Sequence, residues 1–175
     1  LGKGTLPVLV IDAGHGGEDG GAVALSGIHE SAINLEIAKK LAALAELTGL
    51  PYVMTRDSED ITYPDSAVTT AKRKVYDTKR RAELVNTTPN AVLLSVHQNF
   101  FPQGSVHGPQ AFYAPTDGSN TFAALVQETM NSAVAPLSRR VCAPAAKNIY
   151  LMKSVTCPAV LVECGKNDIQ LTKCH

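Results

Sequence analysis

The sequence lacks several features that mark whole classes of protein. Its 16 lysine and arginine residues are balanced by 16 aspartate and glutamate residues, so no basic field is present to hold a nucleic acid. No apolar run approaches the ~18 residues that are needed to cross a bilayer. The first residues, "LGKGTLP", lack the segments of a signal peptide, which gives no information about the compartment. We therefore expect neither nucleic-acid binding nor a membrane span.

The cysteines also lack a recognisable pattern. Cys142, Cys157, Cys164 and Cys174 do not form the C-x-x-C pairs of zinc knuckles and redox motifs. We expect small buried side chains, with a disulfide as the less favoured alternative. No repeat, low-complexity tract or linker divides the 175 residues, so we expect one domain over residues 1–175.

Strand-like and helix-like segments alternate along the chain. Apolar, β-branched runs predict strands at residues 6–14, 51–56, 90–99, 110–114, 148–152 and 158–165. Apolar residues at helical spacing predict helices at residues 31–47, 71–87 and 120–137, and residues 57–70 are expected to form an exposed loop. The alternation predicts a single α/β domain, with a twisted, mostly parallel sheet of about six strands and helices on both faces.

Side chains that can bind a metal lie where three of the predicted strands end. His15 follows the first strand in "VLVIDAGHGGEDGGA", His97 lies near the end of "AVLLSVHQN", and Glu163 lies near the end of "PAVLVECG". Ligands of open α/β sheets bind beyond the carboxyl ends of the strands. Glu30 directly precedes the first predicted helix, and the loop before it can bring its carboxylate to the same crevice. We expect these four side chains to meet at one edge of the sheet.

Two histidines and one carboxylate are a common ligand set for a catalytic zinc ion, and a further carboxylate nearby can act as general base. Glu163 lies in an apolar run, where a carboxylate is costly to bury without a cation or hydrogen bonds. An ion pair with an arginine such as Arg81 is the alternative explanation. A dinucleotide-binding loop is disfavoured, because "GHGGED" lacks the last glycine of G-x-G-x-x-G and no helix follows it directly.

At these residues the chain resembles the zinc-dependent N-acetylmuramoyl-L-alanine amidases of bacterial cell-wall turnover. The resemblance covers nearly the whole chain and rests on "DAGHGG", "ESAINL", "SVHQN" and "PAVLVECG". It implies that His15, Glu30 and His97 hold one Zn2+ ion and that Glu163 is the catalytic general base. His29, next to Glu30, is the less favoured alternative ligand.

The resemblance also implies supporting residues, whereas the substrate-binding residues are expected mainly from their place at the end of a predicted strand. Arg81 and Asn86 match an arginine and an asparagine of the family pattern and are expected to support the site. Gln98 and Asn99, which follow the second histidine ligand, are expected to bind substrate or support the metal, and the aromatic pair at residues 100–101 is expected to line the same groove.

The expected reaction is hydrolysis of the amide bond between N-acetylmuramic acid and the first L-alanine of the peptidoglycan stem peptide. Two alternatives stay open: a zinc peptidase or deacetylase of another substrate, and a non-catalytic muropeptide-binding module, because the residues after "VECG" depart from the family pattern. "SVHQNFF" and "GPQAFYAP" look most like amidases of spore-forming Gram-positive bacteria. We therefore expect a monomer that is exported to the cell wall or spore envelope and acts on peptidoglycan or muropeptides. A regulatory partner is compatible with this expectation.

Overall fold

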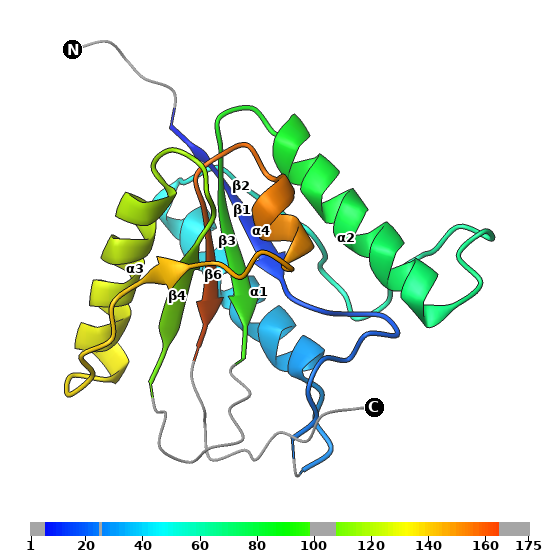
Figure 1. Ribbon diagram of the computed structural model, residues 1–175, viewed down its shortest axis with the longest axis horizontal. Coiled ribbons are helices and arrows are strands. Elements are labelled where there is room, and N and C mark those ends of the chain that lie inside the picture. Colours follow the sequence, from blue (N-terminus) through cyan, green and yellow to red (C-terminus); the bar gives the residue numbers. More distant parts are fainter. Residues whose placement is uncertain (1–5, 25, 99–107, 165–175) are drawn as a thin grey trace.

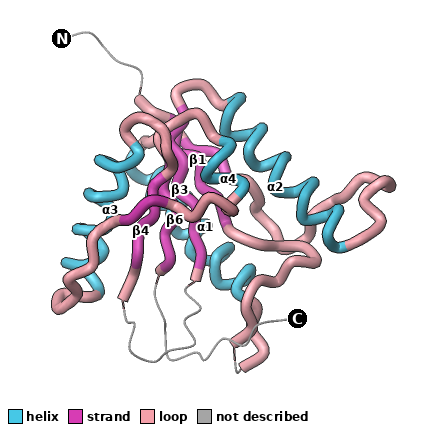
Figure 2. The backbone as a smooth tube through the Cα atoms, in the orientation of Figure 1, coloured by secondary structure: helices cyan, strands magenta, loops and turns pink. Residues whose placement is uncertain are grey.

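A six-stranded sheet forms the centre of the computed structural model, which describes residues 6–24, 26–98 and 108–164 (Figures 1 and 2). Its strand order is β2-β1-β3-β6-β4-β5. Neighbouring strands are parallel, except that β4 runs antiparallel to β6. This confirms the predicted mostly parallel α/β domain. The strands are β1 (Val8–Ala13), β2 (Tyr52–Met54), β3 (Ala91–His97), β4 (Gln110–Tyr113), β5 (Ala143–Pro144) and β6 (Ala159–Glu163).

Helices cover both faces of the sheet, as the alternation of strands and helices predicted (Figure 1). Successive residues of a strand point to opposite faces. In β1, Val10 packs in the cluster that includes residues of α2 and α4, whereas Ile11 packs with residues of α1. In β6, Val160 packs with residues of α3. The helices are α1 (Glu30–Thr48), α2 (Thr70–Thr87), α3 (Ser119–Val134) and α4 (Tyr150–Ser154).

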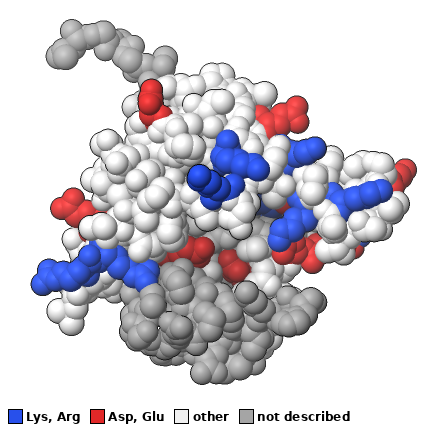
Figure 3. Space-filling view, viewed as in Figure 1, with Lys and Arg blue, Asp and Glu red and all other residues white. Residues whose placement is uncertain are grey.

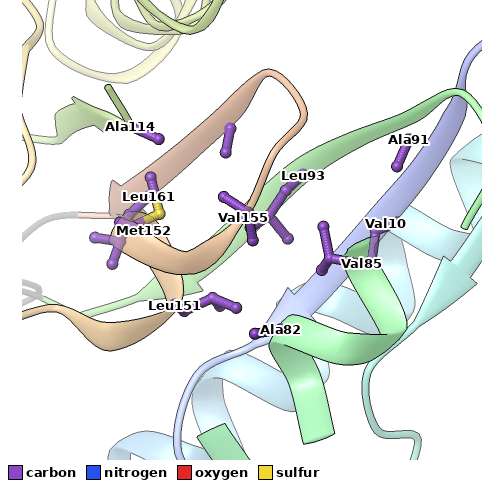
Figure 4. Close-up of a cluster of buried hydrophobic side chains, with 11 residues drawn as sticks. Val10, Ala82, Val85, Ala91, Leu93, Ala114, Leu151, Met152, Val155 and Leu161 are labelled. Carbon is purple, nitrogen blue, oxygen red and sulfur yellow. The ribbon is translucent and has the colours of Figure 1, made fainter. Parts of the chain in front are cut away.

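The core beneath α2 and α4 fixes these helices on the sheet (Figure 4). Val10 and Leu93, from the neighbouring strands β1 and β3, meet Val85 of α2 and Met152 of α4, and all four are almost completely buried. Burial of a side chain of this size stabilises the fold by roughly 1.5–3 kcal/mol. The cluster therefore holds both helices against the sheet.

One predicted strand is wrong. Residues 148–152 contain the start of the short helix α4, and the small strand β5 lies before them instead. Leu151 and Met152 of this segment are buried together with Val155, which directly follows α4, and the spacing of the three is helical. A short apolar run such as "NIYLM" does not distinguish a strand from a buried helical turn.

The described cysteines, Cys142, Cys157 and Cys164, are free thiols and partly buried, whereas Cys174 lies outside the described residues. Burial raises the pKa of the Cys164 thiol to about 11. Within the described part of the chain, no helix combines the length and the apolar character that crossing a membrane would require.

Candidate metal centre

Three side chains with metal-binding atoms meet beyond the carboxyl ends of β1 and β3. His15 lies just after β1, Glu30 is the first residue of α1, and His97 is the last residue of β3. One donor atom from each lies within 4.8 Å of the others. Glu30 Oε1 is 3.4 Å from His15 Nε2 and 3.4 Å from His97 Nδ1. The structure therefore brings the three predicted ligands together, whereas His29 is exposed and lies outside this group.

Glycines allow this close approach. A Cβ atom on Gly14 would lie 2.4 Å from the ring of His97, and a Cβ atom on Gly21 would lie 2.7 Å from Glu30 Oε2. His15 itself adopts a left-handed backbone with φ of 61°, which costs a residue with a side chain roughly 1–2 kcal/mol. Such strain is concentrated at functional sites. The glycine-rich sequence around His15 is thus required by the site's compact geometry.

Backbone and amide groups fix the carboxylate of Glu30. Its Oε1 accepts a hydrogen bond from the backbone N of Gln98 at 3.0 Å, and its Oε2 accepts one from the backbone N of Ala22 at 3.0 Å. Asn34 Nδ2 is 3.4 Å from Oε1, and the buried side chain of Gln98 donates to Asn34 Oδ1 at 3.1 Å. The structure therefore places Gln98 behind Glu30, where it supports the carboxylate.

The charges of this group favour a bound cation. Burial alone would raise the pKa of Glu30, but hydrogen bonds with His15 and His97 hold that pKa well below its usual range. Burial alone would lower the pKa of His15, but hydrogen bonds with Asp19 and Glu30 raise it to about 9. The carboxylate stays ionised and attracts positive charge, which a proton supplies here and a metal ion can supply instead.

Glu163 lies beside His97, because the two residues are register partners on the neighbouring parallel strands β6 and β3. Glu163 Oε2 is buried and has no hydrogen-bond partner among the described residues. Burial raises the pKa of this carboxyl group, although the nearby His97 opposes the shift. An unpartnered buried oxygen is costly, so it commonly marks a position where function needs a free acceptor.

Arg81 holds the end of β1 from the side of α2. Its guanidinium group donates to Asp12 Oδ1 at 2.8 Å, to Asp77 Oδ2 at 2.7 Å and to the carbonyl oxygen of His15 at 2.7 Å. The suggested ion pair with Glu163 is therefore wrong. Arg81 instead anchors the backbone at the first predicted ligand.

Asn86, the other residue that was expected to support the site, does not contact the metal-binding side chains. Asn86 binds the backbone of Ser154 and Thr156, which ties α2 to the turn before β6. Its predicted supporting role is therefore wrong. Residues 99–101, which include Asn99 and the predicted aromatic pair, lie outside the described residues, and the expectations for them stay predictions.

Sequence reasoning missed Asp19. Its Oδ2 lies 3.1 Å from His15 Nδ1 and 2.8 Å from Lys74 Nζ of α2. A bridge between Gly16 and Asp19 turns the loop back on itself. The signal was present in the sequence, because an acidic pair between two glycine pairs is typical of a tight turn.

A cavity of about 460 Å³ opens beside the metal-binding side chains, with residues of α2 and α4 in its walls. His15 and His97 line it together with Tyr63, Ile149 and Tyr150. The two imidazole rings therefore lie next to apolar and aromatic side chains. Figure 3 shows acidic side chains in the middle of this view and basic side chains over α2. Charged side chains such as Asp19, Arg73 and Lys74 also line the cavity, so it offers a ligand both apolar surface and polar contacts.

The fold and the site together define an α/β protein with a His-Glu-His donor set at the carboxyl edge of its sheet. The family model described as N-acetylmuramoyl-L-alanine amidase matches residues 9–171. The chain therefore belongs to the N-acetylmuramoyl-L-alanine amidase family, as its resemblance implied.

Known relatives agree with this assignment. The germination-specific N-acetylmuramoyl-L-alanine amidase of Bacillus subtilis is 31% identical over 159 residues, which are 90% of this chain and 66% of that protein. The amidase AmiC of Neisseria meningitidis is 34% identical over 75% of this chain and 28% of its own length. The chain thus spans less than two thirds of these relatives.

A solved structure shares the fold closely. The CwlD amidase from Clostridioides difficile, in complex with the GerS lipoprotein, superimposes with a TM-score of 0.83 and 32% sequence identity, covering 91% of this chain and 82% of that chain.

Proposed function

We propose that the protein hydrolyses the amide bond between N-acetylmuramic acid and the first L-alanine of the peptidoglycan stem peptide. The observation that carries this proposal is the meeting of His15, Glu30 and His97 beside the unpartnered carboxyl oxygen of Glu163. Membership of the amidase family supports the choice of substrate.

The donor atoms fit a zinc ion. Two atoms that each lie about 2.1 Å from an ion, at a tetrahedral angle, are about 3.4 Å apart. The distances from Glu30 Oε1 to His15 Nε2 and to His97 Nδ1 are both 3.4 Å. These three residues would hold the ion and leave a fourth position open. A bound zinc ion supplies Lewis-acid chemistry, which polarises the scissile carbonyl and makes water nucleophilic near neutral pH.

Glu163 acts as the general base in this proposal. Its free Oε2 accepts a proton from the attacking water, and the carboxyl group then passes that proton to the amine nitrogen of L-alanine as the amide bond breaks. Burial raises the pKa of Glu163 toward the working pH, which improves a carboxylate as a proton acceptor. Arg81 and Gln98 keep the neighbouring ligands in place.

The cavity between α2 and α4 accommodates part of the substrate. Tyr150 and Ile149 present aromatic and apolar surface a short distance from the histidines. Such surface suits the face of a sugar ring or the methyl groups of lactate and alanine. Asn99, two residues after His97 in the sequence, remains our predicted substrate contact.

The envelope is the expected place of action. Peptidoglycan lies outside the membrane, and relatives include a germination-specific amidase, so we propose that the protein acts in the cell wall or in the spore envelope. The related amidase from Clostridioides difficile binds a lipoprotein, which supports a regulatory partner for this chain also.

Digestion of purified peptidoglycan tests the proposal. Mass analysis should find free stem peptides that begin with L-alanine, together with glycan strands that keep the lactyl group of N-acetylmuramic acid. A peptidase would release shorter peptides, a deacetylase would leave the stem attached, and a binding module would sediment with the polymer and yield no product. Each of these three results would contradict the proposed reaction.

A further inference from the structure

Asp19 makes a direct contact with one of the proposed metal ligands. Its Oδ2 lies 3.1 Å from Nδ1 of His15, on the opposite side of the imidazole from Nε2. Nε2 in turn faces Glu30 Oε1 at 3.4 Å. The ring of His15 is therefore held between two carboxylates, one at each nitrogen.

This arrangement selects one tautomer of His15. In a neutral imidazole one nitrogen carries the proton and the other offers a lone pair. A proton on Nδ1 can be donated to Asp19, and the lone pair then lies on Nε2, directed to the place where the three donor atoms meet. His97 faces Glu30 with Nδ1 and therefore needs the opposite tautomer. The site requires one histidine of each tautomer.

Asp19 is itself fixed by contacts that do not involve the metal site. Lys74 Nζ of α2 lies 2.8 Å from Asp19 Oδ2, and the backbone N of Gly21 lies 3.3 Å from Oδ1. The backbone of Asp19 exchanges two hydrogen bonds with Gly16, at 2.8 and 3.1 Å. An acceptor held from three sides has little freedom to leave the imidazole.

We propose that Asp19, held by Lys74, is a positioning residue that fixes the ring and the tautomer of His15 for zinc binding. The proposal rests on the proposed function, because it assigns a role relative to the zinc ion that His15, Glu30 and His97 would hold. Carboxylate partners of this kind typically account for ~10–100-fold in metal affinity.

The neighbouring residue supplies a matched control. Glu18 lies in the same turn and pairs with Arg73 and Thr70 of α2, but it does not contact His15. Glu18→Ala therefore removes one carboxylate and its contacts with α2, as Asp19→Ala does. If these carboxylates only attach the loop to α2, the two substitutions should have the same effect on zinc binding.

The experiment measures the zinc dissociation constant of the full chain by competition with a chromophoric chelator. Asp19→Ala should weaken zinc binding by about 10–100-fold, whereas Glu18→Ala should leave it near the wild-type value. If Asp19→Ala fails to fold, Asp19→Asn keeps the size of the side chain without its charge and should weaken binding in the same direction. Equal zinc affinity in a folded Asp19 variant and the wild type would overturn the proposal.

A spectroscopic measurement reports the tautomer directly. Long-range nitrogen–proton NMR spectra of the zinc-loaded wild type should show His15 with its proton on Nδ1 and His97 with its proton on Nε2. The opposite tautomer at His15 would overturn the proposal and leave the proposed function intact. A wild-type protein that binds no zinc at all would overturn both.

Discussion

Replacing Arg81 by methionine tests how strongly the site depends on the charge network beneath it. Arg81 is 3% exposed and donates to the carboxylates of Asp12 and Asp77 and to the carbonyl oxygen of His15. Removal of one partner from a buried ion pair usually costs about 3–5 kcal/mol, because the remaining charge stays buried. Asp12 keeps two hydrogen bonds from hydroxyl groups, so we expect about 3 kcal/mol, at the lower end of that range.

The measurement is the free energy of unfolding in urea, followed by circular dichroism. For a domain of this size, a loss of about 3 kcal/mol lowers the melting temperature by roughly 6–12 °C. Lys79→Met is the matched control, because Lys79 lies on the same helix and is exposed, and its replacement should change stability by no more than about 0.5 kcal/mol. Equal effects of the two substitutions would show that Arg81 contributes only as a surface cation, and the reasoning would then be refuted.

Three further substitutions test the site. Glu163→Gln should preserve zinc affinity while lowering kcat by ~10²–10⁴-fold, because the amide cannot accept the proton; full turnover would exclude Glu163 as the base. Gly14→Ala should weaken zinc binding in the same chelator competition, because the added methyl group would occupy space 2.4 Å from the ring of His97; unchanged affinity would mean that the ring does not hold this position. Burial alone would raise the pKa of Asp12, but Arg81 and two hydroxyl groups lower it from 3.8 to about 2. The ionised carboxylate of Asp12 thus stabilises the fold above pH 3.8, and this contribution is lost as the pH falls toward 2. Between pH 5 and pH 2 the free energy of unfolding, measured in urea titrations, should therefore fall by about 2 kcal/mol more in the wild type than in Asp12→Asn. Parallel loss in both proteins would contradict the low pKa.

The sequence was sufficient to predict where the site lies. Continuous apolar runs identified β1, β3 and β6, and parallel strands place their carboxyl ends at one edge of a sheet. His15, His97 and Glu163 follow or end these strands, so their proximity followed from topology alone. The sequence placed Glu30 at the same edge only on the condition that the preceding loop folds back, and the family resemblance then favoured it over His29 as a ligand.

The support of the site could not be predicted in the same way. A turn brings Asp19 to His15, whereas its other partner, Lys74, is far away in the sequence. No local sequence pattern reveals the contact with Lys74. The supporting role predicted for Asn86 was wrong for a related reason. A match to the family pattern gives the type of a residue but does not say which way its side chain points. Its side chain lies near the end of α2 and forms hydrogen bonds with the turn before β6. It does not contact the metal-binding side chains.

The strand register explains why the proposed ligands come from both faces of the sheet, with the proposed base on the same face as His97. Ser95, His97 and Glu163 continue the alternation of Leu93 and Leu161, whose side chains pack under α2 and α4. The His97–Glu163 pair therefore belongs to that face and is fixed by hydrogen bonding between β3 and β6. Glu30 comes from α1, which covers the opposite face. Hydrogen bonds from the backbone N atoms of residues 22 and 98 hold its carboxylate at the edge of the sheet. A shift of α1 along the sheet would consequently move Glu30 away from the two histidines, while His97 and Glu163 kept their spacing. Metal affinity would therefore fall before the geometry of proton transfer changed.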